Sequence, residues 1–386
     1  MTFPTSQDLI RAAELETNLS DWTLDHTGTP FEGLQILVDD LHMHAGMHVT
    51  GEHRFYRALM EVLTSRLKYV ADRKRNPGWR DEVVSEPIFI LGLPRSGTTF
   101  LHNLMGADPE RRAPRLHELW GPSPRIEGDM ARQLRVEYCR DRLSSLGMLD
   151  EDWLGVHPMG PDRAEECIFF WDLLLSSVTF MAWAEIPNYQ QFVFSRDFRG
   201  IYREYRDYLK YMQFRTRNRG WVLKTPIHVR FLDEILDTFP DARFVHCHRD
   251  TAKIYPSIAN MTTVLHSKFV NVPPHENAVA GDYDGTWQSA LEFRQRPGMA
   301  ERFVDIQFLD FRDDPIGTVR RIFEALGENF SRERETALEA WLKHDVSERA
   351  GQKHHQYSLA DIGVTEADID RKTGDYLAAF NVRLER

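Results

Sequence analysis

Apolar residues recur at helical spacing near the start of the chain. The pattern runs through SQDLIRAAELE, residues 6–16, and through HRFYRALMEVLTSRLKYVADRKR, residues 53–75. Apolar side chains three and four positions apart share one face of a helix, so both stretches predict amphipathic helices. The turn-forming sequence RNPG, residues 75–78, ends the second stretch. We therefore expect residues 1–80 to form a helical N-terminal segment.

Short apolar runs of strand length follow. There are four of them: PIFILGL (87–93), WVLK (221–224), RFVHCH (243–248) and RFVDIQF (302–308). Three lead into stretches with helical patterning, which begin at Thr98, Ile227 and Thr251. Continuously apolar strands that alternate with helices are typical of a parallel sheet covered on both faces. We therefore expect an α/β fold with a parallel central sheet.

The order of these patterns also predicts how the chain is organised. Its 386 residues suffice for one large domain with insertions or for two domains, and we expect a single domain over 1–386. Residues 87–119 and 218–330 form its predicted core. Residues 120–217 read as mainly helical and aromatic, and 331–386 as helix and loop. We expect the 120–217 insertion to cover the carboxyl edge of the sheet, where open α/β sheets bind ligands.

The most apolar window is CIFFWDLLLSSVTFMAWAEI, residues 167–186. It has nearly the length of a membrane span, yet Asp172 lies inside it and Glu165, Glu166 and Glu185 lie at its ends. Charged groups in a membrane segment are unfavourable. We therefore predict a helix that is buried or faces the active site. Glu165 and Glu166 either shape an acceptor pocket or begin a solvated helix.

The stretch FILGLPRSGTTFLHNLM, residues 89–105, reads as a buried strand, a glycine turn and a helix start. Gly92 and Gly97 have the spacing of an ATP-type phosphate loop, but Thr98 stands where that loop has lysine. Backbone amides at a helix N-terminus bind anions, and Arg95 adds a full positive charge. No apolar strand ends in an obvious acidic Mg²⁺ ligand. The loop therefore suits an anion without a γ-phosphate; a turn without a ligand is the alternative.

A second group of polar residues follows the strand RFVHCH. Arg249 stands where this strand leaves the sheet, and Ser257 lies eight residues later on the predicted helix. An arginine and a serine at this separation can converge on a second phosphate group. Taken alone, Arg249 also suits an ordinary ion pair.

Composition and charge indicate which classes of partner and which compartment suit the protein. The formal net charge is 48 − 59 = −11, which disfavours nucleic acid as the main target. Three cysteines lie far apart without metal-ligand spacing, which suits a reducing compartment. The N-terminal stretch has no basic region followed by an apolar run, so we expect a cytoplasmic protein without a membrane span.

Several ordered motifs resemble the sulfotransferases that use 3′-phosphoadenosine 5′-phosphosulfate (PAPS), especially their bacterial and tyrosyl-protein-type branches. The motifs are LPRSGTTF (93–100), WVLKTPIH (221–228), FPDARFVHCHRD (239–250), HRDTAKIYPS (248–257) and FLDFRDDPIGTVRRIFEALG (308–327), with a weaker match at HQYSLADIG (355–363). The resemblance implies the family's fold, with a P-loop-like phosphate-binding loop. It also implies sulfuryl transfer to a hydroxyl of a small-molecule acceptor, with adenosine 3′,5′-bisphosphate (PAP) as the product.

The resemblance also assigns residues to the nucleotide. The first loop would hold the 5′-phosphosulfate through Arg95, Ser96, Gly97, Thr98 and Thr99, and Arg249 and Ser257 would hold the 3′-phosphate. Phe100 and Phe308 would lie near the adenine. Many members have Lys, Trp and Tyr where Arg95, Phe100 and Phe308 stand. Lys353 or His355 would supply the further 3′-phosphate contact that a basic loop usually makes.

Sulfuryl transfer needs positive charge at the leaving oxygen and a base for the acceptor, and in principle no metal. For the leaving side we expect Arg95, Thr98 and Lys224, although Lys224 could also be a surface lysine at a strand end. In the branch that this chain resembles, a glutamate in the segment 112–125 acts as base, and Glu118 fits within two positions. His117 is the alternative, and on an extended segment only one of the two would face the site.

The residues alone leave two other functions open. An ATP-dependent P-loop kinase would need a lysine at Thr98 and Mg²⁺ ligands. A non-catalytic nucleotide-binding protein of the same fold would need neither. His44 and His48 have i,i+4 spacing, but the absence of an HExxH pattern argues against a metal site there. The identity of the acceptor is not specified by the insertion.

Overall fold

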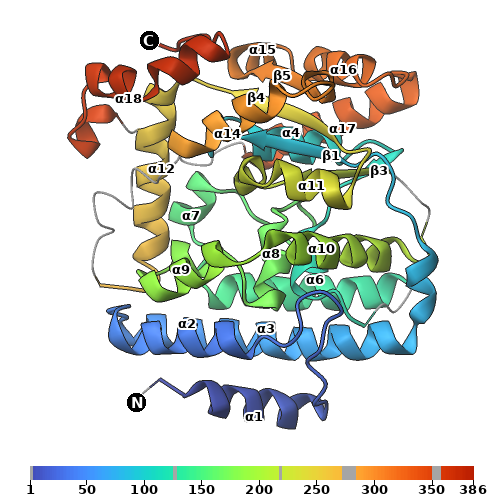
Figure 1. Ribbon diagram of the computed structural model, residues 1–386, viewed down its shortest axis with the longest axis vertical. Coiled ribbons are helices and arrows are strands. Elements are labelled where there is room, and N and C mark those ends of the chain that lie inside the picture. The colour runs from blue at the N-terminus through green and yellow to red at the C-terminus, as the bar shows by residue number, and fades with distance from the viewer. Residues whose placement is uncertain (1–2, 125–127, 217–219, 272–283, 350–357) are drawn as a thin grey trace.

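A five-stranded parallel sheet forms the centre of the upper half of the protein in Figure 1. The computed structural model describes residues 3–124, 128–216, 220–271, 284–349 and 358–386. The strands are β1 (Ile88–Gly92), β2 (Arg111–Arg112), β3 (Gly220–Lys224), β4 (Arg243–His248) and β5 (Phe303–Gln307), in the order β2-β3-β1-β4-β5. Every neighbouring pair is parallel. The predicted α/β fold with a parallel sheet is confirmed.

The four apolar runs coincide with β1, β3, β4 and β5, so their assignment as strands is confirmed. The sequence did not predict β2, which consists of two arginines that pair with Gly220 and Trp221 of β3. Because β1 lies between β3 and β4, the phosphate loop after β1 has the ends of both neighbours beside it. In particular, Ile90 of β1 pairs with Lys224 at the end of β3.

Alternating residues of the strands enter two separate cores, as expected for a sheet with both faces covered. On one face, Ile88, Ile90, Val222 and Val245 pack with residues of α4 (Thr98–Met105) and α16 (Pro315–Ala325). On the other face, Phe89, Leu91, Leu223 and Phe244 join the larger core that extends to the N-terminal helices. Burial on both faces fixes the register of the strands and therefore the position of their carboxyl ends.

The N-terminal segment is helical, as its pattern predicts. It contains α1 (Ser6–Thr17), α2 (Phe31–Met43) and α3 (Val49–Arg75), which form the bottom layer in Figure 1. The Gly51 amide donates to Nδ1 of His48, 2.8 Å away, so this histidine caps the N-terminus of α3. This capping explains His48 without the metal site that its spacing from His44 had suggested.

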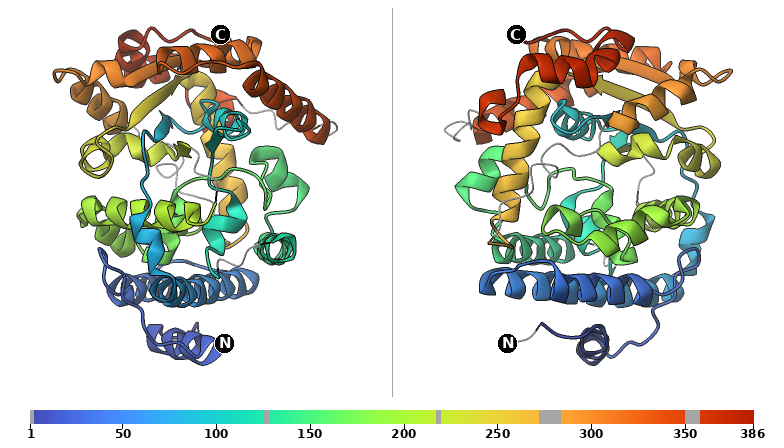
Figure 2. Two further views of the ribbon diagram at one scale, coloured as in Figure 1. Left: turned by 90° about the vertical axis from the view of Figure 1, so that its right-hand side faces the viewer. Right: turned by 60° about the vertical axis from the view of Figure 1, so that its left-hand side comes forward.

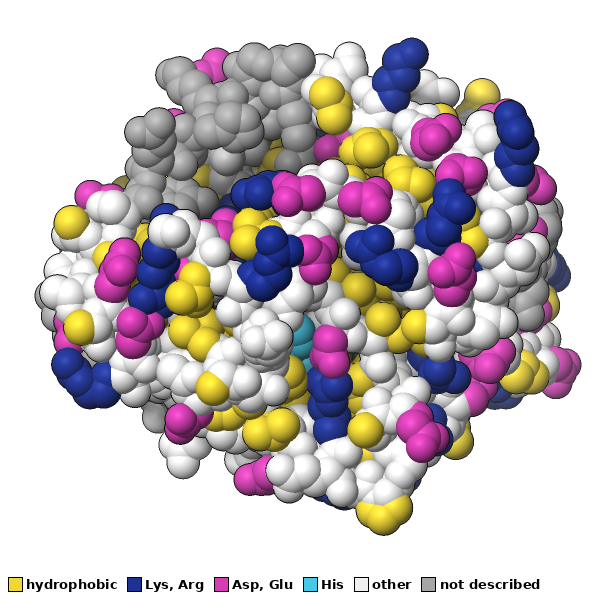
Figure 3. All heavy atoms as spheres, turned by 90° about the horizontal axis from the view of Figure 1, so that it is seen from above, with side chains coloured by type: hydrophobic (Ala, Val, Ile, Leu, Met, Phe, Trp, Pro, Cys, Tyr) yellow, Lys and Arg dark blue, Asp and Glu magenta, His cyan; other side chains and the backbone are white. Residues whose placement is uncertain are grey.

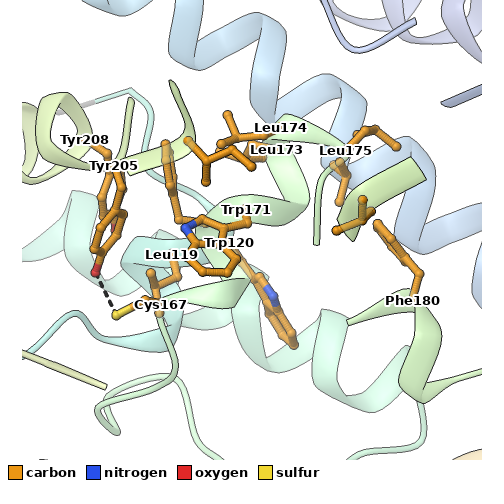
Figure 4. Close-up of a cluster of buried hydrophobic side chains, with 14 of the residues drawn as sticks. Leu119, Trp120, Cys167, Trp171, Leu173, Leu174, Leu175, Phe180, Tyr205 and Tyr208 are labelled. Carbon is orange, nitrogen blue, oxygen red and sulfur yellow. Dashed lines mark hydrogen bonds between the residues drawn. The ribbon is translucent and has the colours of Figure 1, made fainter. Parts of the chain in front are cut away.

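Helices of the 120–217 region lie between that bottom layer and the sheet (Figures 1 and 2). They are α6 (Asp129–Ser145), α7 (Glu151–Val156), α8 (Ile168–Trp171), α9 (Pro187–Ser195) and α10 (Phe198–Gln213), preceded by α5 (Leu116–Trp120). Their aromatic residues are mostly core, as Figure 4 shows for Trp120, Trp171, Phe180, Tyr205 and Tyr208. The Tyr205 hydroxyl donates to Sγ of Cys167, 2.9 Å away.

The apolar window 167–186 is buried, as predicted, but the prediction of one helix is wrong. The chain forms the short α8 and two 3₁₀ turns, Asp172–Leu174 and Phe180–Ala182. Leu175 between them has φ 49°, a left-handed conformation that an α-helix cannot contain. Figure 4 shows Leu173, Leu174 and Leu175 pointing into the aromatic core. Within the described residues no helix is long and apolar enough to cross a membrane.

After β3 the chain completes the layers around the sheet. It forms a 3₁₀ turn (Pro226–Arg230), α11 (Leu232–Thr238), α12 (Thr251–His266), α14 (Asp284–Arg294), α15 (Phe308–Asp313), α16, α17 (Arg332–Arg349) and α18 (Glu366–Ala379). The helices expected from Thr98 and Thr251 are confirmed, whereas the stretch from Ile227 begins as the 3₁₀ turn and becomes helical at Leu232. The long α12 runs from α18 down to the middle layer in both figures.

Candidate active site

The turn between β1 and α4 requires glycine at two positions. Gly92 has φ 143°, and a Cβ there would lie 2.6 Å from the carbonyl oxygen of Cys247 on β4. Gly97 has φ 92°, and its Cβ would lie 3.1 Å from the ring of Phe308. Any larger residue would therefore push the loop away from β4 and from α15. The spacing of these glycines reflects this close approach.

The loop presents a helix N-terminus. Gly97 is the N-cap of α4, and no side chain caps this helix. The Ser96 hydroxyl instead donates to the Leu93 carbonyl, 2.7 Å away, which braces the turn. Uncapped amides and the helix dipole favour an anion at this position. The side chain of Thr98 is buried beneath it.

The two predicted phosphate motifs meet in the structure. Nε of Arg95 donates to Oγ of Ser257 on α12 at 2.9 Å, and Nη1 of Arg249 donates to the Arg95 carbonyl at 2.9 Å. The first motif and the second are 154 to 162 residues apart in sequence. The two predicted motifs are therefore in direct contact, because Ser257 bonds to the Arg95 side chain and Arg249 bonds to the Arg95 backbone.

Arg249 has a carboxylate partner that the sequence did not predict. Both oxygens of Glu385 accept from its guanidinium, at 2.8 Å from Nε and 3.1 Å from Nη2. The same guanidinium lies over the ring of Phe308, 3.8 Å from its centroid, which is a cation–π geometry. Arg249 thus presents a planar fork that already holds an anionic group. The face seen in Figure 3 carries acidic and basic side chains in mixture.

Lys224 is buried at the end of β3 rather than exposed as a surface lysine. Its Nζ donates to Oγ1 of Thr99 at 3.1 Å and to Oε1 of Glu166 at 2.8 Å. The hydroxyl of the next residue, Thr225, donates to the other oxygen of Glu166 at 2.9 Å. The structure therefore joins Lys224 to the phosphate loop through Thr99, as its place beside β1 had suggested. Glu166 is its partner, which sequence reasoning missed.

The two candidates for the base lie on α5, so the expectation of an extended segment there is wrong. Oε1 of Glu118 accepts from Nη2 of Arg112 at 2.6 Å, and Oε2 accepts from the Arg115 amide at 3.0 Å, which caps α5. Nδ1 of His117 lies 2.8 Å from the Pro161 carbonyl, which can only accept, so Nδ1 carries the proton. Burial lowers the pKa of His117, which disfavours the protonated ring.

The remaining predicted nucleotide residues divide into three groups. Phe308 lies against the phosphate loop and under Arg249. Phe100 packs with Phe311 and Trp341, at centroid distances of 5.2 and 5.6 Å. Lys353 and His355 lie outside the described residues.

One cluster of metal-ligand types exists among the described residues, on β4 and β5. His246, His248 and Asp305 bring their ligand atoms within 4.8 Å of one another. Both oxygens of Asp305 accept from the guanidinium of Arg294, and His248 Nε2 lies 3.0 Å from the same carboxylate. A carboxylate held by an arginine in this way is poorly suited to a cation. Its two histidines are buried, whereas Asp305 is exposed and already paired with Arg294.

Comparison with known proteins identifies the family of the chain. A family model described as "Sulfotransferase family" matches residues 87–332, which include both phosphate motifs. The curated ω-hydroxy-β-dihydromenaquinone-9 sulfotransferases Stf3 of Mycobacterium bovis and Mycobacterium tuberculosis are each 26% identical over 257 residues. The match covers 64% of this chain and spans 63% of the length of those relatives.

Two crystal structures resemble almost the whole chain. Sulfotransferase STF1 from Mycobacterium tuberculosis has a TM-score of 0.80 and 27% identity, covering 97% of this chain and 99% of its own. Sulfotransferase STF9 from Mycobacterium avium has a TM-score of 0.85 and 25% identity, covering 100% and 98%. The match of the family model over residues 87–332, more than half of the chain, shows that the chain belongs to the sulfotransferase family.

Proposed function

We propose that the protein transfers a sulfuryl group from PAPS to a hydroxyl of a small-molecule acceptor. In this reaction the acceptor oxygen forms a bond to sulfur while the bond between sulfur and the leaving phosphate oxygen breaks. The hydroxyl proton goes to a base, and the products are the sulfate ester and PAP. The family of the chain and its similarity to two mycobacterial sulfotransferases over nearly their full length support this proposal.

The observation that carries the proposal is the contact among Arg95, Ser257 and Arg249. It joins an anion-binding helix N-terminus to a second cationic fork. Two anion sites side by side suit a nucleotide that carries one phosphate group at its 5′ side and another at its 3′ position. ATP has its phosphates in one chain and a 3′-hydroxyl, so it would leave the Arg249 fork without a phosphate.

Each remaining residue has a proposed role that follows from its position. Arg95, Thr98 and Lys224 would stabilise the negative charge that develops on the leaving phosphate oxygen, because preorganised donors act strongly in a buried site. Ser96, Gly97 and Thr99 would contribute loop contacts. Phe308 and Phe100 would lie near the adenine, and Lys353 or His355 would contact the 3′-phosphate. No metal is needed for this set of contacts.

For the base we propose Glu118, with His117 as the alternative. Glu118 has a partner in Arg112, 2.6 Å away, that fixes its position. A general base in this role typically contributes on the order of 10² to 10⁴ in rate. Because the two residues are neighbours on α5, their variants can be compared directly.

The proposed acceptor is a small molecule with a free hydroxyl. The curated relatives are named for a hydroxylated dihydromenaquinone, an apolar molecule with an alcohol. We propose an apolar alcohol of this kind as the first acceptor to examine. We also propose a cytoplasmic site of action.

The test is direct transfer. The full-length protein is incubated with PAPS, EDTA and a panel of hydroxylated acceptors, and both the sulfate ester and PAP are measured by mass spectrometry. The proposal predicts equal amounts of ester and PAP, a reaction rate unchanged by EDTA, and loss of both products in Lys224→Ala. Transfer of phosphate from ATP–Mg²⁺ to the same acceptors, without transfer from PAPS, would contradict it.

A further inference from the structure

Two neighbouring glutamates, Glu165 and Glu166, lie beside the carboxyl end of β3. The segment that carries them is fixed there, since the Cys167 amide donates to the Lys224 carbonyl at 3.0 Å. The two side chains then take different partners. Oε1 of Glu165 lies 3.2 Å from Nε2 of His157 and Glu165 is fully buried, whereas Glu166 turns to the lysine. The two neighbours therefore have separate partners, and of the two Glu166 is the one bonded to Lys224 of the proposed transfer machinery.

The burial of Lys224 requires such a partner. Its side chain has no exposed surface, and an ammonium group without a counter-charge in such a place is strongly unfavourable. Glu166 Oε1 supplies the negative charge at 2.8 Å. Nζ has three N–H donors, and among the described residues Thr99 and Glu166 accept two of them. This arrangement leaves one donor for a bound group at the loop.

Glu166 is itself held at both oxygens. Thr225 donates its hydroxyl to Oε2 at 2.9 Å, while Oε1 accepts from Lys224. The result is a continuous chain of hydrogen bonds from Thr225 through Glu166 and Lys224 to Thr99 on the phosphate loop. Because both oxygens of Glu166 are bonded, this carboxylate cannot rotate freely. The Lys224 ammonium group that it holds therefore has one preferred location.

We infer that Glu166 is a positioning residue that fixes the Lys224 ammonium group against Thr99 of the phosphate loop. This inference rests on the proposed sulfuryl transfer. Lys224 has a long flexible stem, and without a fixed partner its charge would sample several positions. Stabilisation of a leaving oxygen depends on donors already in place before the reaction. Glu166 acts through Lys224, because its Oε1 accepts from the Lys224 ammonium group.

The test compares Glu166→Gln and Glu166→Asp with wild type, in steady-state transfer from PAPS and in PAP binding by calorimetry. Glutamine keeps the shape and loses the charge. We expect it to lower kcat on the order of 10- to 100-fold, as misplaced catalytic groups do, while KM for PAPS and PAP affinity change less than about threefold. Aspartate keeps the charge and should recover part of kcat. Glu335→Gln, which disrupts a surface pair with Arg320, is the control with wild-type kinetics.

A second variant keeps the inference testable if Glu166→Gln fails to fold. Thr225→Val removes the hydroxyl that orients Oε2 and keeps the volume, and we expect a kcat loss of about three- to tenfold at unchanged PAP affinity, the size of one lost hydrogen bond. Unchanged kcat in either folded variant, or equal losses in kcat and PAP affinity, would overturn the inference alone. A wild-type protein that binds PAP but shows no transfer from PAPS would instead overturn the proposed function and, with it, this role.

Discussion

Both carboxylate oxygens of Glu385 hold the guanidinium of Arg249, at 2.8 and 3.1 Å. The pair lies where the 3′-phosphate of the nucleotide is proposed to bind, and both side chains are partly exposed. A phosphate group has the same planar relation to an arginine fork as a carboxylate has. The nucleotide would therefore have to replace Glu385 as the partner of Arg249.

Glu385→Gln should strengthen PAP binding. Glutamine removes the competing charge, so the 3′-phosphate no longer has to break an ion pair. We expect Kd to fall about fivefold, which corresponds to the upper range for a partly exposed pair. AMP, which lacks the 3′-phosphate, should bind with unchanged affinity. Calorimetric titration measures the Kd of both nucleotides. An equal fall in the Kd of AMP, or no fall in the Kd of PAP, would contradict the idea that Glu385 and the 3′-phosphate compete for Arg249.

Arg249→Ala should weaken PAP selectively. The substitution removes a charge-assisted fork, so we expect PAP affinity to fall about 10- to 100-fold and AMP affinity to change less than about threefold. Arg249→Lys keeps the charge without the planar fork and should give an intermediate loss. The assignment of Arg249 to the 3′-phosphate is wrong if PAP and AMP lose affinity equally.

Substitution of Glu118 and of His117 by an amide side chain shows which of the two α5 residues is the base. Glu118→Gln preserves the hydrogen bond to the Arg115 amide and removes the base, so kcat should fall on the order of 10²- to 10⁴-fold with PAP affinity unchanged. His117→Asn should cost less than about tenfold. Thermal melts of both variants control for folding. A larger kcat loss in His117→Asn would transfer the role to the histidine.

The sequence predicted the sheet better than the contacts in the site. Buried parallel strands need continuous apolar runs, and these predicted β1, β3, β4 and β5; β2 consists of two arginines and has no such signal. The composition of 167–186 correctly indicated burial, but it does not reveal that Leu175 breaks the helix.

Side-chain pairing over long distances is the part that a single sequence does not specify. The glycine spacing and the positions of Arg249 and Ser257 were readable because they are local patterns. Glu166 and Lys224 are 58 residues apart, and Arg249 and Glu385 are 136 apart. Only the fold brings these charges together, so neither carboxylate was predicted in its role.

Buried histidines should make the protein sensitive to acid. Burial lowers the pKa of both His102 and His228 from 6.5 to about 3, with nearby positive charge adding to the effect. Below pH 6.5 the unfolded chain therefore binds protons that the folded chain does not. The stabilising effect is fully present above pH 6.5 and is lost as the pH falls towards 3.

Urea denaturation at a series of pH values measures this dependence. The free energy of unfolding should fall between pH 6.5 and 5 by up to about 1.4 kcal/mol per pH unit for each buried histidine. His228→Gln should reduce the slope, whereas His344→Gln, at an exposed position, should leave it unchanged. A slope that is the same in His228→Gln and wild type would contradict the buried neutral state.

Thermal stabilisation by nucleotides tests the central claim most directly. Ligands that bind the folded state raise Tm, and at equal concentration the ligand with the higher affinity raises it more. Wild-type protein is melted with PAP, with AMP and with ATP–Mg²⁺ at equal concentrations. A PAPS-dependent sulfotransferase should be stabilised most by PAP, clearly less by AMP and least by ATP–Mg²⁺. Stabilisation by ATP–Mg²⁺ without any effect of PAP would contradict the proposed function.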